Sequence, residues 1–126
     1  MSATPSADIP QFEISSERGP GDTFVVRVVG EVDMSREDEV RQELRRAVDE
    51  KPSGIVVDLT ECEFIDSSGV RALLLSREAQ NSDEDSERLA VAASSEQILR
   101  ILSVMGLDKV IPVHPTVEEA AAALQG

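Results

Sequence analysis

The sequence predicts an α/β domain built on a mostly parallel sheet. Short apolar runs alternate with segments of helical periodicity throughout the second half of the chain, as in proteins whose parallel strands are joined by crossover helices. The run 55–59 is apolar from its first residue, which is typical of a strand buried on both faces. We therefore expect a mixed sheet of four or five strands, with an antiparallel hairpin at its N-terminal end and about four helices.

The composition fits one small domain with an aliphatic core. The 126 residues are 40% hydrophobic but only 2% aromatic, so Val, Ile, Leu and Ala must fill the core. Residues 1–10 are rich in Ser, Ala and Pro and are expected to form a flexible tail, which leaves 11–126 as the domain. We expect this domain to be a monomer.

The charge and the cysteine content exclude several classes of function. Twelve basic against 25 acidic residues give a net charge of -13, which opposes binding to nucleic acid or to an anionic membrane. Cys62 is the only cysteine, so there is neither a disulfide framework nor a cysteine-rich zinc site. No signal peptide or membrane-spanning run is visible. We therefore expect a cytoplasmic protein without a metal or a cofactor.

The first elements are expected to form the hairpin. Phe12 and Ile14 alternate with polar residues and predict a short strand, which the Gly-Pro-Gly-Asp turn at 19–22 connects to a second strand over 24–29. Gly30 is expected to end this second strand. Such a short connection favours antiparallel pairing of the two strands.

A helix and the central strand follow the hairpin. Apolar residues recur at helical spacing between 35 and 50, and Ser35 is the expected N-cap. These apolar residues are Val40, Leu44, Ala47 and Val48. Residues 51–54 contain Pro and Gly and end the helix, so that 55–59 becomes the central strand.

The next helix is expected to begin at the bend 66–69 and to end near Gln80. The acidic stretch 81–87 then predicts a loop. A short strand over 89–93 follows it.

The last part of the chain predicts two helices separated by an edge strand. Ser94 or Ser95 caps the first helix, and Gly106 closes it. Residues 110–113 predict the last strand, which Pro112 places at the edge of the sheet. The apolar stripe of the final helix consists of Val117, Ala120, Ala121 and Leu124.

The bend 66–69 carries the candidate site. The first turn of a helix leaves backbone N–H groups unpaired and carries a partial positive charge, so a phosphate is stabilised there. Asp66, Ser67 and Ser68 are all favourable caps, and Gly69 is expected to give the bend conformational freedom. The two hydroxyls should therefore be accessible. Taken alone, however, the motif predicts no more than a capped helix.

Four motifs, in this order and spacing, resemble the STAS domain of the bacterial anti-anti-sigma factors, also called anti-sigma factor antagonists. The motifs are Gly30-Glu31-Val32-Asp33, Asp58-Leu59-Thr60, the run 64–69 and Met105-Gly106-Leu107. The resemblance covers the chain from about residue 11 onward.

The resemblance implies a stress-response regulator of transcription that binds its partner and is not an enzyme. In this family, the domain captures an anti-sigma factor that is also a GHKL-type serine kinase, and thereby frees a sigma factor. The kinase phosphorylates the second serine, here Ser68, and a serine phosphatase restores the active form. By the same resemblance, the partner-binding surface comprises Asp33, Asp66, Ser67, Ser68 and Gly69.

One segment departs from the family pattern. The acidic stretch 81–87 replaces the short glycine-containing turn that is usual before the following strand. This difference does not affect the predicted phosphorylation of Ser68. It concerns which partner the domain binds. A solvated turn is favoured over a contact with a basic partner.

Three other functions compete with this interpretation. Within the family, the domain could be a scaffold in a signalling assembly that does not release a sigma factor. A small serine hydrolase would need a base near Ser67 or Ser68, but the chain has only His114 and lacks the Gly-x-Ser-x-Gly motif. A phosphoaspartate receiver would use Asp58, but Asp33 and Lys109 poorly match the paired acids and the lysine that it requires.

The remaining polar residues have simpler explanations. Asp33 could contact the partner or merely belong to the turn before Ser35. His114 is expected in a surface turn, and Cys62 in the connection after the strand 55–59 as an unreactive thiol. Asp58 is expected to bond to neighbouring backbone and not to a metal.

Overall fold

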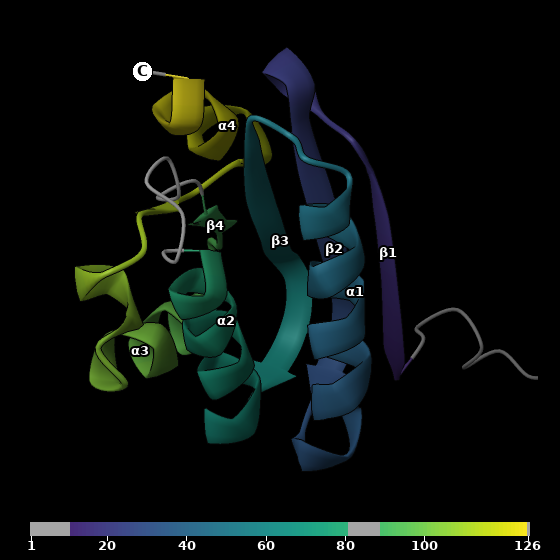
Figure 1. Cartoon of the computed structure of the whole chain (residues 1–126). Helices are drawn as coiled ribbons and strands as arrows, with labels where there is room; N and C mark the ends of the chain where they lie inside the picture. The colour runs from purple at the N-terminus through teal and green to yellow at the C-terminus, as the bar shows by residue number, and fades with distance from the viewer. Residues whose placement is uncertain (1–10, 81–88, 126) are drawn as a thin grey trace, which may run out of the picture.

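A five-stranded mixed sheet forms the centre of the molecule (Figure 1). The structure is a computed structural model that describes residues 11–80 and 89–125, so the predicted tail 1–10 and loop 81–87 lie outside the described residues. The strands lie side by side in chain order: β1 (Phe12–Arg18), β2 (Thr23–Val32), β3 (Gly54–Ile65), β4 (Leu89–Ala92) and β5 (Val113–His114). β1 pairs antiparallel with β2, and all later neighbours are parallel. The predicted fold class is confirmed.

Four α-helices cover the two faces of the sheet over the described residues. They are α1 (Glu37–Asp49), α2 (Ser67–Gln80), α3 (Glu96–Val104) and α4 (Val117–Gln125). Residues from α1, α2 and α3, such as Leu44, Leu73 and Leu102, pack against one face in a single apolar cluster. On the opposite face, Ala120 and Leu124 of α4 pack against a smaller cluster of strand residues. No helix in the described part of the chain is both long and apolar enough to span a bilayer.

Strand β2 continues past Gly30, contrary to the sequence-based prediction. Gly30 has a φ of +93°, and the pairing register with β3 shifts between Gly30 and Glu31. A glycine adopts positive φ at low cost, so the strand accommodates an irregularity here without ending. The extension brings Val32 level with Ile65 at the end of β3.

The last strand is shorter and later than predicted. Leu107–Lys109 form a 3₁₀ turn, η4, and Ile111 is buried with its N–H donating to the Leu107 carbonyl oxygen at 2.8 Å. Only Val113–His114 pair with β4, at the edge of the sheet. His114 therefore lies in a strand and not in a surface turn.

The predicted boundaries of α3 are confirmed. The Ser95 hydroxyl accepts a hydrogen bond from the Ile98 N–H at 3.5 Å, so Ser95 is the N-cap. Gly106 has a φ of +80° in the left-handed region just after the helix. This is the conformation in which glycine commonly closes a helix.

Candidate functional site

The bend after β3 joins the carboxyl ends of two neighbouring strands. The Asp66 N–H donates to the carbonyl oxygen of Val32, the last residue of β2, at 3.1 Å. Helix α2 begins immediately afterwards, at Ser67. In parallel sheets, binding sites gather at this edge, where strands end and helices begin.

Asp66 is the cap of α2, and the two serines lie within the helix. The Asp66 Oδ1 accepts hydrogen bonds from the N–H groups of Ser68, at 2.9 Å, and Gly69, at 3.2 Å. Of the three predicted caps, only Asp66 therefore acts as one. The carboxylate already occupies these two donors of the first turn, so an incoming anion would have to displace it.

The two hydroxyls are free of internal hydrogen bonds within the described residues. Ser67 is exposed and Ser68 is half-buried, so both are in contact with solvent. The predicted accessibility is therefore confirmed, more fully for Ser67. Because residues three, four and seven apart share one face of a helix, Ser68 lies on the same face of α2 as Ala72 and Leu75.

Gly69 is needed for space and not for conformational freedom. It is buried, and its φ lies outside the positive range. A Cβ atom at this position would lie 2.6 Å from Cγ1 and 2.9 Å from Cδ1 of Ile65, and 2.9 Å from Cγ1 of Val32. The glycine lets the first turn of α2 approach the ends of β2 and β3. Ser67 and Ser68 therefore lie at the carboxyl ends of these strands.

Asp33 is the equivalent capping residue after β2. Its Oδ1 accepts hydrogen bonds from the Ser35 N–H at 2.9 Å and from the Ser35 hydroxyl at 2.5 Å, at the start of the 3₁₀ turn η3 (Met34–Arg36). The two hydrogen bonds from Ser35, with a smaller contribution from the charge of Arg36, lower the pKa of Asp33. Ser35 is not the cap of α1, because the first residue of α1 is Glu37.

Asp33 and Asp66 thus occupy corresponding positions on adjacent strands. Each follows the last residue of its strand, and the Asp66–Val32 hydrogen bond ties these two strand ends together. Asp33 is exposed. The structure therefore brings four of the five predicted site residues to the surface at one edge of the sheet, while Gly69 lies buried beneath them.

Two exposed apolar side chains border this edge and were not predicted as site residues. Met34 follows Asp33 and is 71% exposed, and Phe64 precedes the bend and is 42% exposed. Phe64 pairs with Glu31 across β2 and β3. The exposure of Phe64 follows from its place in β3, where the neighbouring Ile65 is the buried residue.

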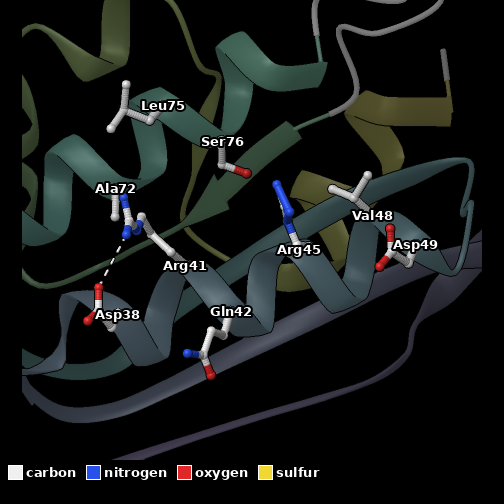
Figure 2. A pocket seen from close by; sticks show the side chains of 9 residues that line it. All are labelled: Asp38, Arg41, Gln42, Arg45, Val48, Asp49, Ala72, Leu75 and Ser76. Carbon is white, nitrogen blue, oxygen red and sulfur yellow. Dashed lines mark hydrogen bonds and ion pairs between the residues drawn. The ribbon is translucent and has the colours of Figure 1, made fainter.

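A groove of about 790 Å³ runs between α1 and α2 (Figure 2). It is lined from α1 by Asp38, Arg41, Gln42, Arg45, Val48 and Asp49, and from α2 by Ala72, Leu75 and Ser76. The Arg41 and Arg45 side chains extend from α1 toward α2. This groove was not predicted, because the two helices that form its walls are separated in the chain by β3.

Cys62 and Asp58 have structural roles. Cys62 lies within β3 and not in a connection, it is 3% exposed, and its Sγ donates to the Phe64 carbonyl oxygen at 3.3 Å. Burial raises the pKa of the thiol to about 11, so Cys62 is not a nucleophile at neutral pH. Asp58 accepts hydrogen bonds from the N–H and the hydroxyl of Thr60, at 3.0 and 2.6 Å, as predicted.

The position of His114 and the spacing of possible metal-binding side chains bear on catalytic or metal chemistry in the same described residues. His114 lies in β5, two strands away from β3, and no hydrogen bond links it to Ser67 or Ser68. Within 11–80 and 89–125, no three His, Cys, Asp or Glu side chains are grouped so that they could hold a metal ion.

Residues 15–120 match the STAS domain family. The chain belongs to this family. Over 116 residues, it is 29% identical to an anti-sigma F factor antagonist from Paenibacillus polymyxa, and the alignment covers 91% of this chain and 95% of the relative. The match to the family model thus covers most of the chain.

Solved structures of STAS domains share this architecture. An anti-sigma factor antagonist from Mycobacterium paratuberculosis is 28% identical, with a TM-score of 0.83 and coverage of 91% of this chain and 95% of the other. The Bacillus cell fate determinant SpoIIAA, solved in its phosphorylated form, is 22% identical, with a TM-score of 0.65 and coverage of 89% and 99%. The likeness to SpoIIAA concerns the fold alone.

Proposed function

We propose that this protein is a cytoplasmic anti-sigma factor antagonist whose activity is switched by phosphorylation of Ser68. In its unmodified form, it binds an anti-sigma factor that is also a GHKL-type serine kinase, and a sigma factor is released. Phosphorylation of Ser68 by that kinase ends the binding, and a serine phosphatase reverses it. The main support is the accessible Ser68 hydroxyl in the first turn of α2, in a chain similar to named anti-sigma factor antagonists.

The electrostatics of the bend explain why a phosphate would act on the interface. A phosphoserine adds about 1.5 to 2 negative charges. The Asp66 carboxylate already accepts from the N–H groups of Ser68 and Gly69, so the phosphate would compete with it for these two donors and would lie beside a like charge. Its charge would therefore be exposed to the partner.

The expected size of this effect is sufficient for a switch. Burying an unpaired, doubly charged group in an interface costs several kcal/mol. A loss of about 4 kcal/mol weakens binding roughly a thousandfold. The fold should change little, because Ser68 is not fully buried and its hydroxyl makes no internal hydrogen bond in the described residues.

Family resemblance, and not exposure, selects Ser68 over its neighbour. Ser67 is the more exposed of the two, so it is the natural alternative acceptor and the matched control. Ser68 shares a helix face with the groove residues Ala72 and Leu75, whereas Ser67 points further toward solvent. A kinase bound over that face would reach Ser68.

The test uses each GHKL-type anti-sigma factor kinase of the same genome, purified separately and incubated with the protein and ATP. Ser68→Ala should bind the kinase as wild type does and accept no phosphate, whereas Ser67→Ala should still be phosphorylated. Ser68→Asp should bind at least tenfold more weakly. Mass spectrometry locates the phosphate, and finding it on Ser67 would overturn the assignment.

A second measurement separates a sigma regulator from a scaffold. Wild-type protein should displace a sigma factor from the kinase in a competition experiment, and the phosphorylated protein should not. Binding without displacement would instead support a scaffold in a signalling assembly.

A further inference from the structure

On α2, the groove between α1 and α2 begins at Ala72, about one helical turn after the candidate phosphorylation site. Ala72 and Leu75 line it from α2, and they lie four and seven residues after Ser68, on the same helix face. A partner that covers the Ser68 end of this face therefore borders directly on the groove.

The α1 wall offers a positive charge that has no ion-pair partner among residues 11–80 and 89–125. Arg41 pairs with Asp38 at 3.2 Å, but Arg45 forms no ion pair within the described part of the chain, although Asp49 lies one turn further along α1. A guanidinium without an ion-pair partner can bind a carboxylate of another protein. Arginine also binds carboxylates through two parallel hydrogen bonds.

Each wall of the groove also carries an exposed apolar side chain. Val48 of α1 is 36% exposed and lies beside Arg45, and Leu75 of α2 is 43% exposed and lines the groove further along, beyond Ala72 (Figure 2). A segment that lies between two helices can bury its apolar side chains against such residues while its charged side chains reach the rim. The groove thus combines one acceptor for a carboxylate with two apolar contacts.

We propose that the α1–α2 groove is a second docking site for the same anti-sigma factor kinase. It accepts an amphipathic segment of that partner, with a carboxylate paired to Arg45 and apolar side chains packed against Val48 and against Leu75. This inference rests on the proposed function, because continuity with Ser68 identifies the occupant. The groove supplies affinity and orientation, while the phosphate acts at the Ser68 end.

The test compares charge reversals in the groove and outside it. The kinase that binds wild-type protein is titrated with Arg45→Glu and with Arg100→Glu, which reverses another exposed arginine, on α3 and outside the groove. Arg45→Glu should raise Kd about tenfold or more, and Arg100→Glu by less than twofold. Because Arg45 is remote from the phosphate transfer, Arg45→Glu should raise the KM for Ser68 phosphorylation and leave kcat unchanged.

Two further measurements define the outcome. Arg45→Gln, which keeps most of the side chain but removes the charge, should lie between wild type and Arg45→Glu, and its binding should depend less on salt. Equal affinities for Arg45→Glu and Arg100→Glu would overturn the groove proposal while leaving the proposed function intact. If wild-type protein binds none of the kinases, both proposals fail.

Discussion

Substituting alanine for Gly69 tests whether α2 is held against the ends of β2 and β3 by close packing. The new Cβ would lie 2.6 and 2.9 Å from two carbons of Ile65 and 2.9 Å from a carbon of Val32. Ordinary contacts between carbons are about 3.5 to 4.0 Å, so the helix or these side chains must move by roughly 1 Å. Ile65 and Val32 are themselves buried, which leaves them little room to yield.

Two opposing free-energy terms decide the result. Replacing glycine by alanine inside a helix stabilises it by up to about 1 kcal/mol, whereas overpacking a buried site costs about 1 to 3 kcal/mol. We therefore expect Gly69→Ala to lower the free energy of unfolding by about 1 to 2 kcal/mol. In a domain of this size, that corresponds to a decrease in Tm of roughly 4 to 8 °C.

Urea denaturation of a double-mutant cycle provides the measurement. Ile65→Ala removes both of the close Ile65 carbons, so Gly69→Ala should cost about 1 kcal/mol less in that background. Gly106→Ala is the control, because its Cβ would meet nothing within 4 Å and its cost arises from the φ of +80° alone. The packing argument is refuted if Gly69→Ala stabilises the protein, or if its cost is the same in both backgrounds.

Two other substitutions test the bend and the strand that precedes it. Asp66→Ala removes the cap of α2 and should destabilise the protein by about 1.5 kcal/mol, whereas Asp66→Asn keeps an acceptor oxygen and should cost less than about 0.5 kcal/mol; equal losses in thermal unfolding would contradict the capping role. Because folding raises the pKa of Cys62 to about 11, the unfolded state loses this proton first, and stability should fall as pH rises from about 9 toward 11. Cys62→Ala should flatten that part of the pH profile, and an unchanged slope would assign the effect to other groups.

Local signals were sufficient to predict most of the fold. The apolar start of β3 and the turn after β1 predicted a central strand and an antiparallel hairpin, and both are present. Ser95 and Gly106 set the limits of α3 through their own side-chain and backbone preferences. Such features depend on a few neighbouring residues, so a single sequence reveals them.

The errors arose where tertiary contacts override local preference. Gly30 resembles a strand end, but pairing with β3 carries β2 through it. Ser35 resembles a cap, but its hydroxyl donates to Asp33, which caps the preceding turn instead. Gly69 was predicted to provide conformational freedom, but its φ is not positive. Only the assembled sheet shows that Ile65 and Val32 occupy the space beside it. The groove of Arg45 and Leu75 depends on two helices that are distant in sequence and was not predicted at all.

The order of the strands in the sheet bears on how the domain forms. Since β1 to β5 lie side by side in the order in which they occur along the chain, each strand can add to the edge of a sheet that earlier residues have already built. No strand has to be inserted between two others, which keeps the sequence separation of contacts low and favours rapid folding. On a ribosome, the domain could therefore assemble from its N-terminal hairpin onward, and the two strands that the Ser68 bend joins, β2 and β3, would both be present before β4 had emerged.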